Sequence, residues 1–406
     1  MTAPVELGWR MGAPRLSEDP DAWSAPRVRE RFSALRESVP TAQVWRGDGP
    51  VSELPYALRD DIDAVAFTPL AGTASMAQMA PMTWRQSLAA NHTDGIVVLH
   101  KGRIVYEHYD GPLQPHTPHV CMSVTKSLVG TLAAAEMVAG RIDPDALVTA
   151  YVPELEASAW GNATVRQVMD MTTALEYDED YTRPGAEVWS YLRAAGQLPR
   201  EPGVIDPAGI RAFLCTVQRN DWHGEAFAYK TVNTEVLAWV LCNVTGQTLQ
   251  QLVQERLWRP MGAEHDAYFG VDGKRLAGAG GAFNGTLRDM ARFGEVMRGN
   301  GFFNGRQIVP EAAVADIRQG AAPAHFARAG YALLKGWSYR HMWWVTHNAH
   351  GAYCARGIHG QGIYIDPVAK MTIARFASHP RAGNAGLDPT TLPAYHALAQ
   401  HLLATP

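Results

Sequence analysis

The chain has 406 residues, of which 47% are hydrophobic and 19% charged, with a formal net charge of -4 at pH 7. This composition supports a sizeable core and excludes a disordered chain. The near balance of charge gives no basic surface for nucleic acid or anionic membranes. The longest near-apolar run, residues 128–140, is interrupted by Glu136 and is too short to cross a bilayer.

The cysteines and the first residues indicate a reducing compartment. No CxxC pair occurs, which predicts reduced thiols rather than a disulfide framework. The N-terminal residues contain no apolar stretch of the kind that a secretory signal needs. We therefore expect a cytoplasmic protein. The four cysteines are Cys121, Cys215, Cys242 and Cys354.

The first half of the chain combines an arm, a hairpin and helices. Residues 1–85 are rich in Pro, Arg and Asp and are interpreted as an arm of loops and short elements. Two β-rich runs, 95–100 and 103–107, are joined by Lys101-Gly102, which is typical of a hairpin. Apolar spacing of three to four residues then predicts helices. These cover 123–139, 164–173, 231–245 and 287–298.

β-rich runs return near the far end, over 336–345, 362–367 and 371–376, and residues 392–403 predict a last helix. Strands from both ends with helices between them indicate an α/β plus α architecture. We expect a discontinuous α/β sheet domain, 86–120 and 287–406, that carries an inserted α-helical domain, 121–286.

The strongest chemical signal is Ser123-Val124-Thr125-Lys126 at the start of a predicted helix. Residues three apart share a helix face, so the Lys126 amine can reach the Ser123 hydroxyl. The positive end of the helix dipole favours a forming alkoxide, and a lysine among apolar neighbours can act as a base. The alternative is a helix that opens with a capping serine and carries a solvent-exposed lysine.

Two later segments could complete such a site. Tyr229 precedes another apolar helix, and its phenol can relay a proton between a nucleophile and a leaving group. Residues 355–362, Ala-Arg-Gly-Ile-His-Gly-Gln-Gly, lead directly into a strand. A glycine-rich strand edge lets a substrate carbonyl approach the backbone, where an N–H can complete an oxyanion hole.

The order of these motifs resembles the serine β-lactamase and penicillin-binding superfamily. Residues 140–145, 151–155 and 280–294 resemble its class-C-like branch. Within that branch, residues 90–400 are similar to the 6-aminohexanoate-dimer hydrolases, the nylon-oligomer amidases. The resemblance implies a β-lactamase-like fold, an antiparallel sheet flanked by helices with an inserted all-α domain. The stretches that carry it are 122–127, 177–181, 233–239 and 357–361.

The resemblance also assigns roles. It implies that Ser123 is the nucleophile, Lys126 its base and Tyr229 the proton relay. The oxyanion hole would be the backbone N–H groups of Ser123 and Ile358. For His359, lining of the site and a purely structural hydrogen bond stay equally open. The expected substrate-binding residues are Tyr181, Trp344, His359, Asn233 and Leu192.

Two positions depart from the family patterns. Ala355-Arg356-Gly357 replaces the Lys-Thr-Gly of penicillin-recognising enzymes, so β-lactam carboxylate recognition is in doubt unless Arg356 substitutes. Leu192 stands where a dimer amidase could hold an acid for a cationic amino terminus. We therefore expect an uncharged amide or ester to be preferred, unless Glu187 or Asp180 supplies that charge.

Other polar features have simpler interpretations. Fifteen histidines raise the question of a metal site, but HExxH is absent, and we expect no metal and no cofactor. The acidic run 176–180 is interpreted as a solvent-facing loop. Gly280-Gly281 is interpreted as a close backbone approach near the cleft. No serine lies in GxSxG, which disfavours the α/β-hydrolase fold.

The sequence thus predicts a serine hydrolase that cleaves a linear amide of the 6-aminohexanoate-oligomer type, or a carboxylic ester, through an acyl-enzyme. The alternatives are an esterase, a β-lactamase or D-peptidase on the same fold, and a catalytically silent binding protein. We expect a small-molecule amide or ester as partner, with no nucleic acid and no membrane. A homodimer and movement of the 176–192 loop stay open.

Overall fold

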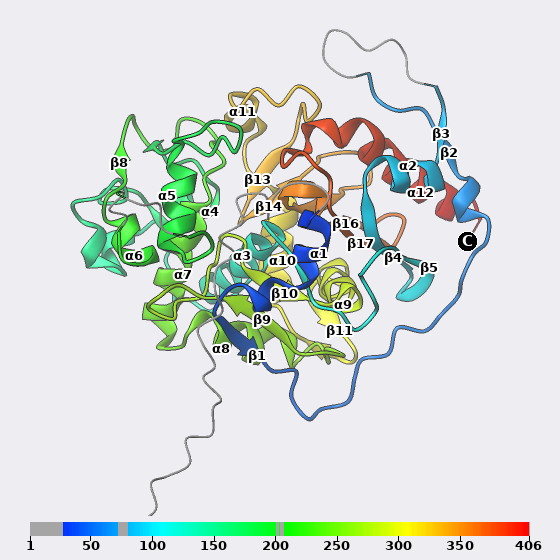
Figure 1. Cartoon of the computed structure of the whole chain (residues 1–406), viewed down its shortest axis with the longest axis horizontal. Coiled ribbons are helices and arrows are strands. Elements are labelled where there is room, and N and C mark those ends of the chain that lie inside the picture. Colours follow the sequence, from blue (N-terminus) through cyan, green and yellow to red (C-terminus); the bar gives the residue numbers. More distant parts are fainter. Residues whose placement is uncertain (1–26, 72–79, 200–202, 204–206, 406) are drawn as a thin grey trace, which may run out of the picture.

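A seven-stranded antiparallel sheet forms the centre of the protein, and the computed structural model describes residues 27–71, 80–199, 203 and 207–405. Because β17 pairs with β4, strands from distant parts of the chain lie side by side (Figure 1). This confirms the predicted sheet. In spatial order the strands are β13 (Ser338–Arg340), β14 (Trp343–Val345), β15 (Tyr353–Arg356), β16 (Gly362–Asp366), β17 (Met371–Ala377), β4 (Thr93–His100) and β5 (Arg103–Tyr109).

Helices cover both faces of the sheet. Successive side chains of a strand point to opposite faces, so two neighbouring residues of β16 show which helix lies on each face. Ile363 of β16 faces α9 (Leu287–Arg298), where an added Cβ at Gly294 would lie 2.9 Å from its Cγ2. The next residue, Tyr364, has its ring 5.2 Å from that of Tyr395 in α12 (Asp388–Ala404). Cover on both faces explains why every residue of β4 and β17 is buried.

A helical region adjoins the sheet. Its centre is α3 (Val124–Val138), which packs against α7 (Val232–Thr245) and α10 (Glu311–Gln319). Most residues of α3 and α7 are buried, as their apolar sequences require. The other helices are α1 (Arg27–Ser33), α2 (Trp84–Ala90), α4 (Val165–Met169), α5 (Glu187–Ala194), α6 (Ile210–Leu214), α8 (Leu249–Val253) and α11 (Pro323–Ala327).

The region 121–286 also contains strands, so the expectation of an all-α insertion is wrong. The strands β9 and β10 join β1 and β6 in a second antiparallel sheet of order β1-β9-β10-β6. They are too short for a period-two pattern to reveal them. The short strands are β1 (Thr41–Val44), β2 (Ala66–Phe67), β3 (Met82–Thr83), β6 (His119–Val120), β7 (Leu175–Glu176), β8 (Gln218–Arg219), β9 (Ala267–Gly270), β10 (Phe283–Gly285), β11 (Phe302–Phe303) and β12 (Arg306–Gln307).

Several predicted elements change length for local reasons. The β-rich run 336–345 is two strands, because His341 and Met342 both adopt positive φ and form the turn between β13 and β14. The helix expected over 164–173 ends at Met169, and Met171 lies in the left-handed region. By contrast, α9 spans the predicted residues, with Thr286 as its cap.

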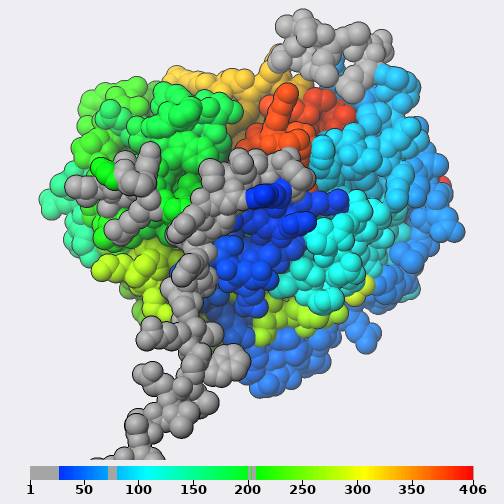
Figure 2. Space-filling view, in the orientation of Figure 1, coloured from blue at the N-terminus to red at the C-terminus, as the bar shows by residue number. Residues whose placement is uncertain are grey.

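The described part of the N-terminal arm lies on the surface of the protein. In Figure 2 the blue segment lies on the viewed face, beside the cyan part of the chain. Its strand β1 pairs with β9, which fixes the arm to the second sheet. Residues 1–26, in which the sequence shows no signal-type stretch, lie outside the described residues. Within the described ranges, no helix has both the length and the apolar character needed to cross a bilayer.

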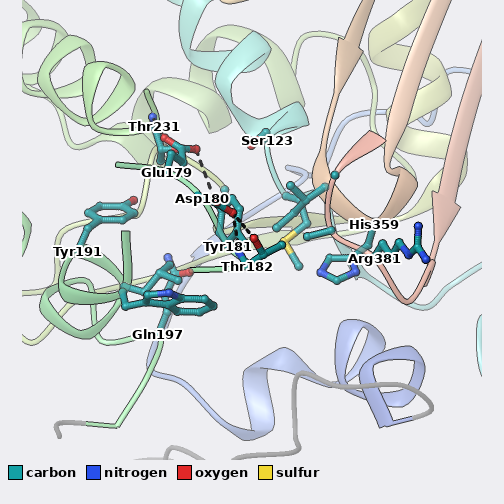
Figure 3. A pocket seen from close by; sticks show the side chains of 18 of the residues that line it. Ser123, Glu179, Asp180, Tyr181, Thr182, Tyr191, Gln197, Thr231, His359 and Arg381 are labelled. Atoms are coloured by element: carbon teal, nitrogen blue, oxygen red, sulfur yellow. Dashed lines mark hydrogen bonds between the residues drawn. The ribbon is translucent and has the colours of Figure 1, made fainter. Parts of the chain in front are cut away.

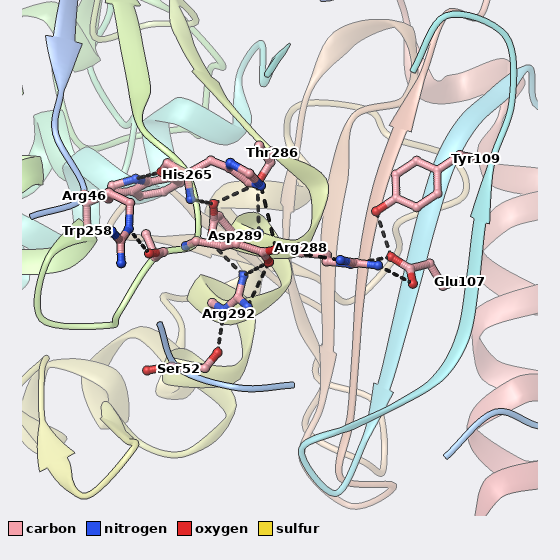
Figure 4. Close-up of polar contacts among 12 residues, drawn as sticks. Arg46, Ser52, Glu107, Tyr109, Trp258, His265, Thr286, Arg288, Asp289 and Arg292 are labelled. Atoms are coloured by element: carbon pink, nitrogen blue, oxygen red, sulfur yellow. Dashed lines mark hydrogen bonds and ion pairs between the residues drawn. The ribbon is translucent and has the colours of Figure 1, made fainter. Parts of the chain in front are cut away.

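A buried ion-pair cluster ties the start of α9 to distant segments (Figure 4). The Asp289 carboxylate accepts the backbone N–H groups of Glu264 and His265, at 2.7 and 3.0 Å. Arg292, 3% exposed, donates to Asp289 and to the backbone oxygen of Ser52, both at 2.8 Å. The cluster therefore joins α9, the loop before β9 and the N-terminal arm.

Asp289→Ala is expected to lower the free energy of unfolding by about 3 kcal/mol, because it leaves the buried Arg292 guanidinium without its nearest carboxylate. Urea unfolding measures this loss. The control is Arg328→Ala. Arg328 forms an ion pair with Glu225 in which both side chains are exposed, so its loss should cost less than about 1 kcal/mol. Equal losses in the two variants would contradict the structural role given to this cluster.

Candidate active site

Ser123 stands in the turn between β6 and α3. Met122, immediately before it, has a φ of +46°, a left-handed conformation that is uncommon for a residue with a side chain. Ser123 itself is helical, with φ -67° and ψ -4°, and its hydroxyl makes no capping hydrogen bond. The alternative of a capping serine is therefore wrong, because the hydroxyl is not bonded to the backbone of its own helix.

The Lys126 amine contacts the Ser123 hydroxyl within the protein interior. Nζ donates to Ser123 Oγ at 2.8 Å and to the backbone oxygen of Gly280. Lys126 is 1% exposed, so the alternative of a solvent-exposed lysine is wrong. Burial lowers the pKa of Lys126 to about 8, while the charges of Glu179 and Glu235 raise it. A neutral amine that can accept the serine proton is thus accessible near neutral pH.

Tyr229, the predicted proton relay, lies close to the Lys126 amine. Its ring stacks on Trp344 with centroids 5.4 Å apart, and Lys126 Nζ lies 5.2 Å from the ring centre. Burial and the Glu179 charge raise the pKa of the Tyr229 phenol well above its usual value, whereas a hydrogen bond with Ser123 lowers it. The phenol therefore stays protonated near neutral pH, which suits a proton donor rather than a base.

Gly280 holds the Lys126 amine and is itself held by Glu235. The Glu235 carboxylate accepts the N–H groups of Gly280 and Ala279, at 2.7 and 3.0 Å. An added Cβ at Gly280 would lie 2.2 Å from Cγ2 of Thr231, so only glycine fits here. The predicted close backbone approach is confirmed. Glu235 has no sequence signal for this role beyond its place on an apolar helix.

Glu179 contradicts the interpretation of residues 176–180 as a solvent-facing loop. Its carboxylate accepts the backbone N–H and the hydroxyl of Thr231, and it lines the cavity beside Ser123. Burial raises the pKa of Glu179, and the charge of Lys126 lowers it. The available signal was the alternation Tyr-Asp-Glu-Asp-Tyr, whose two-residue spacing can turn the tyrosines and the central glutamate inward.

The glycine-bearing strand end approaches the turn before the serine. An added Cβ at Gly357 would lie 3.0 Å from the backbone oxygen of Cys121 and 3.1 Å from Cβ of Met122. This approach brings Ile358 to the cavity that Ser123 also lines. Among the described residues, neither the Ser123 N–H nor the Ile358 N–H has a hydrogen-bond partner. Two unpaired N–H groups beside one cavity can form an oxyanion hole.

A cavity of about 710 Å³ opens beside Ser123 (Figure 3). Of the expected substrate-binding residues, Tyr181, Leu192 and His359 line it. Figure 3 shows Glu179 and Tyr191 on one side of the cavity and His359 and Arg381 on the other. Asp180 lines this cavity as well, whereas Glu187 does not.

A second cavity, of about 280 Å³, also reaches Ser123. Trp344 lines this one together with Tyr229 and Arg356. Arg356 pairs with Asp388, and its guanidinium lies 5.1 Å from the Trp344 ring centre. Arg356 therefore lies at this cavity as one half of an ion pair.

His359 combines the two roles that the sequence left open. It lines the larger cavity, and its Nδ1 donates to the backbone oxygen of His379 at 2.7 Å. Burial lowers the pKa of His359, which keeps the ring neutral. Across the described parts of the chain, no group of three or more histidine, cysteine, aspartate or glutamate side chains is arranged to hold a metal ion.

The expectation that Asn233 binds substrate is not met by its position. It is fully buried in α7, and it lines neither of the two cavities beside Ser123. Its Oδ1 accepts Nε1–H of Trp160 and the hydroxyl of Thr173, both at 2.9 Å. The side chain therefore connects α7 to neighbouring segments of the helical region instead of contacting a substrate.

We expect the rate constant kcat/KM to rise with pH through an apparent pKa near 8, because only the neutral Lys126 amine accepts the serine proton. Below this pKa the ammonium form predominates and the rate falls about tenfold per pH unit. A pH–rate profile on a neutral ester measures the effect, and Lys126→Arg should lose about 10³-fold. A flat profile from pH 6 to 10 would contradict it.

Glu179→Gln gives a second test of whether Lys126 causes the rise of kcat/KM with pH. The negative charge of Glu179 raises the pKa of Lys126, so its removal should move the rising limb to lower pH. Glu176→Gln is the matched control, since Glu176 lies shortly before Glu179, at the end of β7, is exposed and lines neither cavity. If the rising part of the pH–rate profile moved equally in both variants, the titrating group would not be Lys126.

Comparison with known proteins identifies a family and two similar proteins. The family model described as Beta-lactamase matches residues 83–394. The 6-aminohexanoate-dimer hydrolase of Paenarthrobacter ureafaciens is 35% identical over 363 residues, covering 89% of this chain and 88% of the relative. A Bacillus anthracis structure provisionally assigned to the same activity has a TM-score of 0.84 and 29% identity, with 99% of both chains covered.

A family VIII carboxylesterase shares the fold, with a TM-score of 0.57 and 17% identity over 77% of this chain and 96% of that one. The likeness to it concerns the fold alone. The family match and the curated relative extend over most of the sequence, including the Ser123 and Lys126 turn and the Ile358 strand end. The chain belongs to the beta-lactamase family.

Proposed function

We propose that the protein is a serine hydrolase that forms an acyl-enzyme at Ser123. The observation that carries the proposal is the 2.8 Å contact between a buried lysine amine and Ser123 Oγ, beside a protonated Tyr229 phenol. Lys126 accepts the serine proton while Oγ bonds to the substrate carbonyl carbon. The N–H groups of Ser123 and Ile358 stabilise the negative oxygen that develops.

The leaving group then departs as a neutral amine or alcohol. Tyr229 donates its phenolic proton to the leaving nitrogen or oxygen as that bond breaks, and the Lys126 ammonium returns a proton to Tyr229. Water attacks the acyl-enzyme by the reverse proton path, which releases the acid and restores Ser123. Each proton that leaves one group is accepted by a named neighbour, so no cofactor is needed.

The substrate class we propose is a linear amide of the 6-aminohexanoate-oligomer type or a carboxylic ester. The named curated relative supports the amide, and a cavity of about 710 Å³ has room for an extended acyl chain. Leu192 makes one wall apolar, and Asp180 is the exposed carboxylate on that cavity. Hydrogen bonds from Thr182 lower the pKa of Asp180, so it stays charged and can face a cationic substrate end.

The alternatives are less well supported. A β-lactamase or D-peptidase needs a cation for the substrate carboxylate, but position 355 is alanine and Arg356 is paired with Asp388. A silent binding protein would have no use for the buried Lys126 and its retained contact with Ser123. Covalent labelling of Ser123 by a fluorophosphonate tests this last alternative, since an unreactive serine would favour it.

Location and assembly stay predictions. All four cysteines are free thiols, which fits a reducing, cytoplasmic compartment. Fractionation of the native host checks the location. Size-exclusion chromatography with light scattering decides whether the chain forms a homodimer.

We expect amine release from the linear 6-aminohexanoate dimer, and hydrolysis of a short p-nitrophenyl ester, to be lost together in Ser123→Ala. Both reactions need the same nucleophile, so one substitution should abolish both. Ester turnover alone would keep the mechanism and move the substrate to esters or uncharged amides. Full activity of Ser123→Ala on either substrate would contradict the mechanism.

Asp180→Asn is expected to raise KM for the dimer about threefold while leaving KM for the neutral ester unchanged, because only the dimer carries an amino terminus. Steady-state kinetics at low ionic strength measure the difference. Glu176→Gln, which removes an exposed carboxylate at the end of β7, shortly before Asp180, is the control for a general charge effect. Equal changes in KM for both substrates would rule out a specific contact with the amine.

A further inference from the structure

A separate hydrophobic cluster joins the N-terminal arm to the residues that flank Ser123. It is distinct from the main core of the described structure and combines arm residues with residues on either side of Cys121. Ile358, which carries the second proposed oxyanion donor, packs against it. The buried members are Val28, Phe32, Leu35, Val39, Val120 and Met122.

Phe32 of α1 is the central side chain of this cluster. It is fully buried, and its ring lies 5.2 Å from the His359 ring and 5.6 Å from the His119 ring, edge-on to both. His119 belongs to the strand before Ser123, and His359 follows Ile358 directly. One side chain of the arm therefore contacts both segments from which the two oxyanion donors come.

The helix that carries Phe32 is fixed to the sheet by an ion pair. Arg29 Nε donates to the buried carboxylate of Asp94 at 2.6 Å, and another guanidinium nitrogen lies 2.8 Å from Asp110. The Ser378 hydroxyl donates to the same Asp94 oxygen at 3.0 Å. Because Ser378 precedes His379, which accepts the His359 hydrogen bond, α1 is connected to the Ile358 segment by a second route.

The backbone beside each donor is strained, so it needs such support. Met122, before Ser123, has φ +46°, and His359, after Ile358, has φ +60°. These left-handed conformations are unfavourable for residues with side chains and persist only where packing fixes them. The Ser123 N–H belongs to the planar peptide that begins at Met122, so rotation of Met122 would redirect that N–H.

We propose that α1, through Phe32, positions the oxyanion hole: it holds the Met122 and Ile358 backbones so that both N–H groups point at the same substrate oxygen. The inference rests on the proposed acyl-enzyme function. Phe32 touches neither substrate nor reacting atoms, so it is a positioning residue. The arm would then contribute to the transition state more than to substrate binding.

The test compares Phe32→Leu with Phe293→Leu, two identical changes at fully buried phenylalanines. Phe293 lies in α9, in the main core. With a p-nitrophenyl ester, Phe32→Leu should lower kcat about tenfold and change KM less than about threefold, since loss of a whole oxyanion donor costs about 10²–10³ in kcat. Phe293→Leu should keep kcat within about twofold at a similar loss of thermal stability.

Inhibition by benzeneboronic acid gives a readout that a purely structural role would not move. Its tetrahedral adduct on Ser123 places an oxygen in the oxyanion hole, so its Ki should rise in Phe32→Leu by about the factor that kcat falls. In Phe293→Leu the Ki should stay unchanged. Unchanged kcat and Ki in Phe32→Leu, or equal losses in both variants, would overturn the proposal.

A smaller pair of variants covers the case in which Phe32→Leu does not fold. Val28→Ala removes two methyl groups from the same cluster, and Val296→Ala does so in α9, where Val296 is equally buried. Val28→Ala should lower kcat and raise Ki more than Val296→Ala does, and equal effects would overturn the proposal. Failure of the hydrolase function itself looks different, because the unaltered protein would then lack Ser123-dependent ester hydrolysis.

Discussion

The site depends on removing the Lys126 amine from water. Burial disfavours the ammonium form, which turns an ordinary cation into a base that can accept the Ser123 proton. Two neighbours keep the amine from becoming a costly unpaired group: Ser123 Oγ at 2.8 Å and the Gly280 backbone oxygen. Glu235, which lines neither cavity beside Ser123, holds Gly280 in place and so helps to position the Lys126 amine.

Three backbone segments that are distant in the sequence meet at Ser123 and the Lys126 amine: Gly280 accepts a hydrogen bond from the amine, and Gly357 closely approaches the turn before Ser123. The turn before α3 carries Ser123, the loop before β10 carries Gly280, and the end of β15 carries Gly357. An added Cβ would collide with Thr231 at Gly280 and would crowd the turn before Ser123 at Gly357. The arm helix α1 lies against the first and third segments. The active site is thus a property of the assembled fold, and no single element contains it.

The sequence predicted the elements with strong periodicity and the residues with a distinctive spacing. The strands β4, β5, β16 and β17, the helices α3, α7 and α9, and the juxtaposition of Ser123 with Lys126 followed from apolar patterns and a three-residue spacing, whereas β15 was not predicted. The short strands of the second sheet could not be predicted, since two to four residues carry no detectable period. Glu179 and Asn233 were misassigned because local composition does not reveal which way a polar side chain points. Tertiary packing decides that, and it turned Glu179 toward the cavity and Asn233 into the helical core.

The most direct test of this account is to titrate Lys126 itself. The chain has only six lysines, so NMR of protein labelled with carbon-13 at lysine Cε gives few signals, and the one lost in Lys126→Arg belongs to Lys126. The account predicts that this signal titrates with a midpoint near pH 8. A midpoint near the ordinary lysine value of about 10.4 would contradict it, because the amine would then remain charged at neutral pH and could not act as the base for Ser123.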